Sequence, residues 1–295
     1  MTKQEILASL DELILETDLD DFSQAQKPVT DTREINQDDI FICIEGYQMD
    51  GHDFAAEAMR KGAALLITQR FLDINLPQIV VADSRKATAL LARKYYNDPS
   101  SQLKLIGVTG TNGKTTITHL CFQLLQEMGK KVGLIGTLGY QIGSALFPTE
   151  RTTPDILDLN NILQQMVEAD IEYVVMEVSS HALALSRVDY LSFTAAVFSN
   201  LTQDHLDFHA DIEDYAATKF RLFQLLKQNN GVALINLDDE YGRRLAKKEH
   251  YKMLGISFQE ADITIKNCRS DFQGSRFSLL KDKQYEHYKT KLSGT

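Results

Sequence analysis

Short apolar runs alternate with amphipathic stretches along most of the chain. In the N-terminal part, the apolar runs that predict strands are 40–44, 64–67 and 79–81, and the amphipathic stretches that predict helices are 1–14, 51–62 and 84–96. Further along, strands are predicted at 104–108, 132–135, 173–176, 195–198, 232–235 and 252–254, with helical patterns between most of them and short charged strands in 263–295. This order favours an α/β protein with a mostly parallel sheet flanked by helices.

The polar segment 97–102, NDPSSQ, interrupts this pattern and contains a proline, so it is the best candidate for a linker. We therefore predict two domains: a small N-terminal α/β domain at 1–98 and a larger domain with a mostly parallel central sheet at 99–295. Short apolar strands that end in polar or glycine residues place ligand chemistry at the carboxyl edge of that sheet.

Composition narrows the choice of partner. The formal net charge is −10 and no long Lys/Arg run occurs, which argues against a nucleic-acid partner and favours a small molecule. No apolar run approaches the roughly 18 residues that a membrane span needs, and the three cysteines are widely spaced. These features predict a cytoplasmic protein without membrane insertion or a disulfide framework.

The segment GVTGTNGKTT, residues 107–116, lies between a predicted strand and a predicted helix. Backbone N–H groups of such a turn converge on an anion, so this segment predicts a phosphate-binding loop for a nucleoside triphosphate. Lys114 can reach the terminal phosphates and Thr115 can hold Mg²⁺. The spacing departs from the usual phosphate-loop pattern, because Gly107 stands six residues before Gly113, and a merely connecting turn is the alternative. The residues expected to contact nucleotide are Gly110, Thr111, Asn112, Gly113, Lys114, Thr115 and Thr116.

Two later segments carry further candidates. Glu177 ends a predicted strand, where a second carboxylate for Mg²⁺ would belong; a strand-end acid that caps the next segment is the alternative. The segment FSNLTQDHLDFH, residues 198–209, concentrates polar groups, and a zinc site at His205 and His209 is disfavoured because the glutamate of a zinc-protease helix is absent. Lys219 lies on a predicted helix whose apolar face includes Tyr215. From the residues alone it is a surface lysine, just as Thr152-Thr153-Pro154 is only a helix start.

Taken together, these motifs resemble the Mur ligases in order and spacing. The resemblance rests on GVTGTNGKTT, GTLG (136–139), RTTPD (151–155), MEVSSHAL (176–183), SNLTQDHLDFH and YAATKFRLF, and on DTRE (31–34) and EGYQMDG (45–51) for a uridine-binding N-terminal domain. It is closest to the members that add the third residue of the peptidoglycan stem. The resemblance implies an ATP-dependent amide ligase that joins L-lysine or meso-diaminopimelate to UDP-MurNAc-L-Ala-D-Glu through an acyl phosphate. A folylpolyglutamate-synthetase-like ligase and a non-catalytic binding remnant are the alternatives.

The resemblance also implies roles for individual residues. It implies catalytic roles for Lys114, Glu177, His205 and Lys219, and two Mg²⁺ ions, one held by Thr115 and Glu177 and the other by His205 and a carbamylated Lys219. The residues implied in substrate binding are Thr30, Thr32, Tyr47, Gln48, Met49, Thr152, Thr153, Ser179 and Arg187. A monomer is expected. Because the chain stops at LSGT, the resemblance also predicts an incomplete end of the ATP-binding domain and no C-terminal amino-acid-binding domain.

Overall fold

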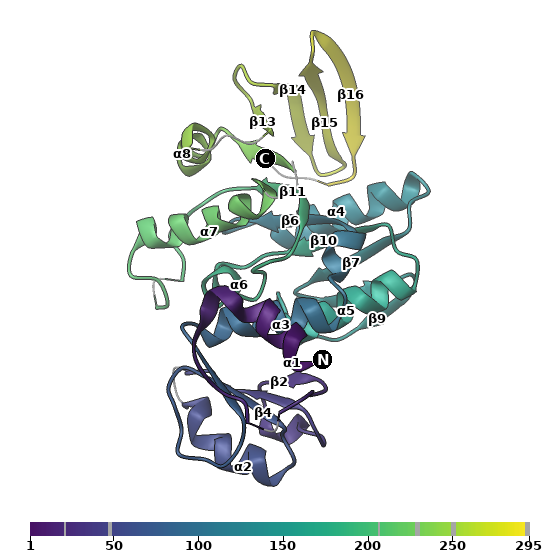
Figure 1. The fold of residues 1–295 in the computed structure, drawn as a ribbon. Coiled ribbons are helices and arrows are strands. Elements are labelled where there is room, and N and C mark those ends of the chain that lie inside the picture. Colours follow the sequence, from purple (N-terminus) through teal and green to yellow (C-terminus); the bar gives the residue numbers. More distant parts are fainter. Residues whose placement is uncertain (21, 47–48, 206, 228–230, 249–251, 293–295) are drawn as a thin grey trace. The chain divides into compact units, whose positions relative to one another are not determined.

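A computed structural model describes the chain except for residues 21, 47–48, 206, 228–230, 249–251 and 293–295 (Figure 1). Its residues form two compact units. The first contains 1–103, 154–170 and 184–191, and the second contains 104–153, 171–183 and 192–295. Helix α5 (Ile156–Glu168), which belongs to the first unit, packs against helix α3 (Ser84–Tyr95) and the 3₁₀ turn η4 (Pro99–Gln102) of the same unit.

In the first unit, the described strands form one five-stranded sheet in the order β1-β5-β4-β3-β2. The four strands from β2 to β5 are parallel, whereas β1 pairs antiparallel with β5 at the edge. The elements of this unit are α1 (Lys3–Leu10), η1 (Asp11–Leu13), β1 (Ile14–Asp18), β2 (Pro28–Val29), η2 (Thr32–Glu34), β3 (Ile40–Ile42), η3 (Gly51–Phe54), α2 (Ala55–Arg60), β4 (Leu65–Thr68), β5 (Gln78–Val81), α3 (Ser84–Tyr95), η4 (Pro99–Gln102) and α5 (Ile156–Glu168).

Helices cover both faces of this sheet, as the alternation along β3 shows. Ile40 and Ile42 pack in one apolar cluster with residues of α1 and α3, while Phe41, between them, packs in a second cluster with residues of α2. Successive side chains of a strand point to opposite faces, so a strand buried on both sides is apolar throughout. The first unit is therefore a three-layer α/β structure.

In the second unit, the described strands form one eleven-stranded sheet in the order β16-β15-β14-β13-β12-β11-β6-β10-β7-β8-β9. Its central strands are parallel, and antiparallel strands extend it at both ends; β14 to β16 are the yellow strands in Figure 1. The elements are β6 (Lys104–Thr109), α4 (Lys114–Glu127), β7 (Val132–Gly136), β8 (Gly139–Ile142), β9 (Ala145–Phe147), β10 (Tyr173–Glu177), α6 (Ser180–Ala184), β11 (Phe193–Phe198), α7 (Ile212–Lys227), β12 (Val232–Asn236), α8 (Glu240–Lys248), β13 (Lys252–Ser257), β14 (Ile263–Asp271), β15 (Gly274–Lys281) and β16 (Gln284–Thr290).

The order of the central strands determines where on the sheet a ligand can bind. Strand β6 lies between β10 and β11, with Glu177 beside Val108 and Phe198 beside Thr109. After β6 the chain passes through α4 to β7 on one side, and after β10 it crosses to β11 on the other side. Ligands of open α/β sheets bind at such a switch point, outside the carboxyl ends of the strands. The loops after β6, β10 and β11 meet there.

The α/β class and the mostly parallel arrangement agree with the prediction from sequence. The prediction was wrong at the N-terminus, where a single helix was expected over 1–14: α1 and η1 end at Leu13, and Ile14 begins β1. Strand β1 is largely exposed and is held by pairing with β5, so its conformation depends on a partner far away in the sequence. The polar first turn of α4 was also missed: residues 107–116 were expected to precede the helix, but α4 begins at Lys114.

Candidate active site

The loop between β6 and α4 has the backbone of a phosphate cradle. Gly110 and Gly113 have φ values of 144° and 86°, a region that favours glycine. A Cβ on Gly110 would also lie 2.0 Å from Ser199 Oγ, so no side chain fits there. Gly113 then stands at the N-cap of α4, directly before Lys114. The two glycines turn the chain from the strand into the helix within four residues, 110–113.

The start of α4 presents unused hydrogen-bond donors. In the described part of the chain, no hydrogen bond uses the N–H of Gly113, Lys114, Thr115 or Thr116, and Ile117 is the first residue whose N–H is bonded, to the Gly113 carbonyl. The first N–H groups of a helix have no intrahelical acceptor and carry the positive end of the helix dipole. The four N–H groups of residues 113–116, which the sequence predicts to contact nucleotide, are therefore available to an anionic ligand.

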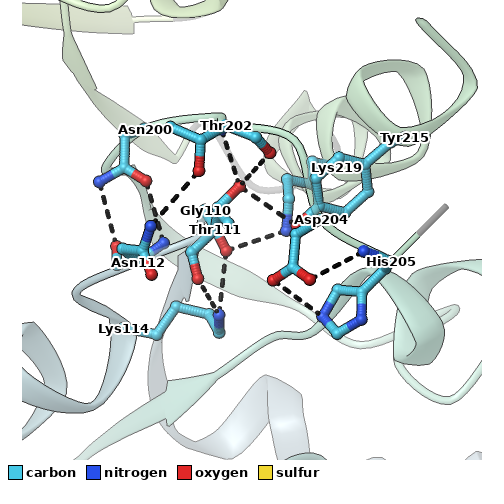
Figure 2. A network of polar contacts seen from close by, with 10 residues as sticks. All are labelled: Gly110, Thr111, Asn112, Lys114, Asn200, Thr202, Asp204, His205, Tyr215 and Lys219. Atoms are coloured by element: carbon cyan, nitrogen blue, oxygen red, sulfur yellow. Dashed lines mark hydrogen bonds and ion pairs between the residues drawn. The ribbon is translucent and has the colours of Figure 1, made fainter. Parts of the chain in front are cut away.

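Lys114 and Lys219 converge on this loop (Figure 2). Both ammonium groups donate to the Gly110 carbonyl oxygen, at 3.0 and 2.9 Å, and Lys114 also donates to the Thr111 carbonyl at 2.9 Å. Lys219 is only 1% exposed. Burial, followed by the charge of Lys114, lowers the pKa of Lys219 from 10.5 to about 7, and the nearby Asp204 carboxylate partly offsets this. Burial also lowers the pKa of Lys114.

Glu177 is a buried carboxylate beside the cradle. Its oxygens accept from Thr115 Oγ1 at 2.9 and 3.0 Å, from Thr137 N at 2.9 Å and from Thr137 Oγ1 at 3.3 Å. Gly136 makes room for it, since a Cβ there would lie 2.4 Å from Glu177 Oε1. A buried carboxylate next to a hydroxyl is an oxygen pair of the kind that Mg²⁺ prefers. Thr115 and Glu177 are thus brought together, although no group of three or more His, Cys, Asp or Glu side chains lies together among the described residues.

His205 stands on the loop after β11, beside Asp204. Its Nε2 lies 3.6 Å from Asp204 Oδ2 (Figure 2), and its ring lies 6.0 Å from the Tyr215 ring, measured between centroids. Lys219 Nζ lies 4.3 Å from the centroid of that same Tyr215 ring. His205 and Lys219 therefore lie on the same side of the cradle, with Asp204 and Tyr215 near both. Sequence reasoning did not assign these last two to the site, although Tyr215 is one helical turn before Lys219.

Three predicted substrate residues of the second unit surround Glu177. Thr152 Oγ1 lies 3.1 Å from Thr137 Oγ1, which itself donates to Glu177. Thr153 Oγ1 donates to the Glu177 carbonyl at 2.9 Å and accepts from Ser179 N at 3.2 Å. Ser179 Oγ in turn accepts from the Ala182 N–H at 3.1 Å. The side-chain hydroxyls of Thr153 and Ser179 thus hold the loop after β10.

The remaining substrate candidates belong to the first unit. Thr30 and Thr32 follow β2, and the loop with Met49, which is 67% exposed, follows the neighbouring parallel strand β3. They therefore emerge at one edge of that sheet. Arg187 pairs with Asp155 at 2.7 Å. Tyr47 and Gln48 lie outside the described residues.

None of the helices that the structure describes has the length and apolar character to span a membrane.

Comparison with known proteins identifies the family. The profile of the Mur ligase middle domain matches residues 108–295, and that of the Mur ligase family catalytic domain matches 29–96. The chain is 42% identical over 268 residues to UDP-N-acetylmuramoyl-L-alanyl-D-glutamate–2,6-diaminopimelate ligase 1 of Clostridium acetobutylicum, which covers 90% of this chain and 55% of the relative. It is 40% identical over 283 residues to the corresponding Aquifex aeolicus ligase. That match covers 95% of this chain and 58% of the relative.

Solved structures agree with this. A structure of a UDP-N-acetylmuramoyl-L-alanyl-D-glutamate–2,6-diaminopimelate ligase matches with a TM-score of 0.85 at 30% identity, covering 99% of this chain and 60% of that one. A Mycobacterium tuberculosis folylpolyglutamate synthase matches in fold alone, with a TM-score of 0.52 at 14% identity over 64% of this chain and 50% of that one. This chain spans a little over half the length of the curated relatives it matches. Motif order, the cradle at the switch point and the profile match over 108–295 lead to one conclusion: the chain belongs to the Mur ligase family.

Proposed function

We propose that this chain binds ATP and UDP-MurNAc-L-Ala-D-Glu for an ATP-dependent amide ligase of peptidoglycan synthesis. The ligase adds a diamino acid, and 2,6-diaminopimelate is the first candidate because the relatives' names contain it. The observation that carries the proposal is the row of unused N–H groups at residues 113–116, together with the Lys114 side chain on the loop and the hydrogen-bonded Thr115–Glu177 pair. Together these groups can hold a triphosphate and its counter-ion.

The reaction has two steps. A carboxylate oxygen of D-glutamate attacks the γ-phosphorus of ATP, an O–P bond forms, and ADP leaves. The amine of the diamino acid then attacks the acyl carbon, phosphate leaves with the electron pair of the C–O bond, and the amine loses a proton. Both steps gather negative charge at the γ-phosphoryl group, so fixed positive charge there lowers the barrier. Lys114 and the N–H groups of α4 supply that charge from this chain.

The residues at Glu177 fit a magnesium ion. Thr115 and Glu177 would hold it through a hydroxyl and a carboxylate oxygen, and the phosphates and water would complete the oxygen ligands. Magnesium, when bound, neutralises phosphate charge and orients the oxygens of ATP. The structural role of Thr137 is to donate to the same carboxylate and fix its orientation.

For a second ion we propose His205 and a carbamylated Lys219. Carbamylation joins the neutral lysine amine to carbon dioxide, forms an N–C bond, releases a proton and leaves a carboxylate. The buried Lys219, with its pKa lowered to about 7, has a substantial neutral fraction near neutral pH, which favours this chemistry. A carbamate also replaces a cation beside Lys114 by an anion, so the like-charge repulsion between the two lysines becomes an attraction.

For the UDP-sugar peptide, we propose that Thr30, Thr32 and Met49 contribute to the uridine end, together with Tyr47 and Gln48. We assign Thr152, Thr153, Ser179 and Arg187 to the muramoyl-dipeptide end, Arg187 being suited to a carboxylate. The folate alternative is weaker, because the solved diaminopimelate ligase structure matches 99% of this chain, whereas the folylpolyglutamate synthase structure matches 64%.

Isothermal titration tests the proposal. The chain is titrated with UDP-MurNAc-L-Ala-D-Glu, with and without a non-hydrolysable ATP analogue and Mg²⁺. Binding of both ligands is expected. Binding of the ATP analogue without any binding of the UDP-sugar peptide would refute the peptidoglycan assignment and favour the folate-type alternative, while failure of both would refute the nucleotide site as well.

A further inference from the structure

The hydroxyl of Thr111 is at the centre of a closed hydrogen-bond network (Figure 2). Its Oγ1 lies 3.2 Å from the Thr202 carbonyl oxygen, 3.0 Å from the Thr202 nitrogen and 3.2 Å from Tyr215 Oη. A hydroxyl offers one proton and two acceptor positions. The carbonyl can only accept, so it takes the Thr111 proton, and the Thr202 N–H fills one acceptor position. The Tyr215 hydroxyl is then the donor to the other, and the hydrogen-bonding capacity of Thr111 is complete.

The backbone of the same half of the loop is also fully used. Thr111 N donates to the Asn200 carbonyl at 2.9 Å, and Asn112 N donates to Asn200 Oδ1 at 2.9 Å. The Asn112 carbonyl accepts from Ser199 Oγ at 2.7 Å and from Asn200 Nδ2 at 3.2 Å. Segment 199–202 thus binds residues 111 and 112 through both backbone and side-chain groups. The loop divides into an anchored half, 111–112, and an open half, 113–116.

Tyr215 holds this anchor from a fixed position. It is fully buried on α7, and its ring packs against Lys219 Nζ, 4.3 Å from the ring centroid, and against the His209 ring, whose centroid is 5.0 Å away. His209 Nδ1 in turn lies 3.1 Å from Asp214 Oδ2 on the same helix. Because the ring cannot move freely, its hydroxyl has one place from which to donate. Three segments, the loop after β6, the loop after β11 and helix α7, meet at this single hydroxyl pair.

We propose that Tyr215 is a positioning residue for nucleotide binding, which acts through Thr111. Its hydroxyl completes the network that fixes the conformation of the loop before the nucleotide binds. The N–H groups of 113–116 therefore already converge on the phosphate position in the ligand-free protein. Thr111 is then an anchor whose hydroxyl is not a phosphate ligand. This inference rests on the nucleotide site proposed above and assigns the residues of the loop to two different tasks.

The direct test is Tyr215→Phe, which removes the hydroxyl and keeps the ring. A preset loop binds more tightly than one that must be ordered on binding. Loss of one hydrogen bond to the anchor should weaken binding of the ATP analogue with Mg²⁺ by about fivefold to tenfold in isothermal titration. Amide hydrogen exchange of Thr111 and Asn112 in the ligand-free protein should become faster. The matched control is Tyr173→Phe, because its hydroxyl, 3.3 Å from Lys104 Nζ, lies at the start of β10, at the opposite edge of the sheet. It should change neither quantity.

A double-mutant cycle separates positioning from a general structural effect. If Tyr215 acts through Thr111, Thr111→Val combined with Tyr215→Phe binds the analogue no more weakly than Thr111→Val alone. Losses that multiply would mean that the two hydroxyls act independently, which would overturn the inference, as would wild-type affinity in Tyr215→Phe. If the wild-type chain did not bind the analogue at all, the proposed function would fail. Unchanged amide exchange in Tyr215→Phe would still count separately against the network.

Discussion

Lys114 and Lys219 both donate to the Gly110 carbonyl, but Lys114 is the first residue of α4 and Lys219 lies on α7, so substitutions of the two lysines test different roles. Lys114 is adjacent to the open N–H groups, so Lys114→Ala should weaken binding of an ATP analogue by about 10- to 100-fold, the usual effect of losing a hydrogen bond to a charged group. Isothermal titration with Mg²⁺ measures it. Lys266→Ala on exposed β14 of the same unit is the charge-matched control and should bind normally. Undiminished affinity in Lys114→Ala would argue against the phosphate loop.

Lys219 should show a pH-dependent carbamate. Only the neutral amine reacts with carbon dioxide, and with a pKa of about 7 the neutral fraction is roughly one tenth at pH 6 and nine tenths at pH 8. At constant dissolved ¹³CO₂, the ¹³C NMR carbamate signal should rise through this range and be absent in Lys219→Met. The same lowered pKa makes the stability of the fold depend on pH. Between pH 7 and 10.5 the unfolded chain binds more protons at Lys219 than the folded chain, so the contribution of Lys219 to the free energy of unfolding rises with pH there. A signal that appears only near pH 10 would contradict the buried environment.

The limits of sequence reasoning at this scale are visible in Tyr215. The sequence predicted its ring on the apolar face of a helix, and the ring is indeed buried. Its hydroxyl bonds to Thr111, more than a hundred residues earlier in the chain, and no local pattern encodes that distance. Lys219 is similar: from the residues alone it was a surface lysine, yet it is 1% exposed. The roles of individual site residues remain predictions.

At the scale of elements, the turn between β6 and α4 depends on a glycine that has no substitute. In Gly110→Ala the added Cβ meets Ser199 Oγ at 2.0 Å, and the backbone has a φ of 144°. We expect a loss of about 2 kcal/mol or more in the free energy of unfolding, from strain and the forced shift of the loop. Chemical denaturation measures this loss, and titration should show weaker binding of the ATP analogue.

Gly143→Ala is the control for this change. It also has a positive φ, of 60°, but nothing lies within 4 Å of its added Cβ. It should therefore lose only about 1 kcal/mol, the cost of the left-handed backbone. Equal losses in the two variants would mean that the contact with Ser199 does not constrain the loop.

Strands were predictable from the sequence where most of their side chains are buried. The strands from β6 to β13 in the parallel part of the sheet consist of short apolar runs and were found, usually within one or two residues of their ends. Strands β8 and β9 were missed because they are short, lie at the edge of the sheet and are held by antiparallel pairing with β7 and with each other. The antiparallel extension β14 to β16 was expected only as short charged strands, and its order in the sheet could not be derived from its composition.

At the scale of the whole molecule, the division into units does not follow the linear sequence. Segments 154–170 and 184–191 group with the first 103 residues. The polar segment 97–102 predicted a break in the chain, and the domain boundary at 98/99 remains a prediction. No property of α5 in the sequence indicates that it packs on α3, because its apolar face would suit any helix or sheet.

This arrangement predicts that residues 1–103 are not self-sufficient. Helix α5 packs against α3 and η4, and Leu159, Leu163 and Met166 on it are fully buried. A fragment of residues 1–103 would expose the surface that α5 covers in the first unit, at a cost on the order of 2 kcal/mol for each buried apolar side chain that loses its place. We expect the fragment to unfold at a clearly lower denaturant concentration than this unit does in the whole chain. A peptide of residues 154–170, added in excess, should stabilise the fragment. The same peptide with Leu159→Asp and Leu163→Asp should have no effect. A fragment as stable as the unit in the whole chain would show that the N-terminal sheet and its own helices suffice, and the linear boundary would then describe the folding unit.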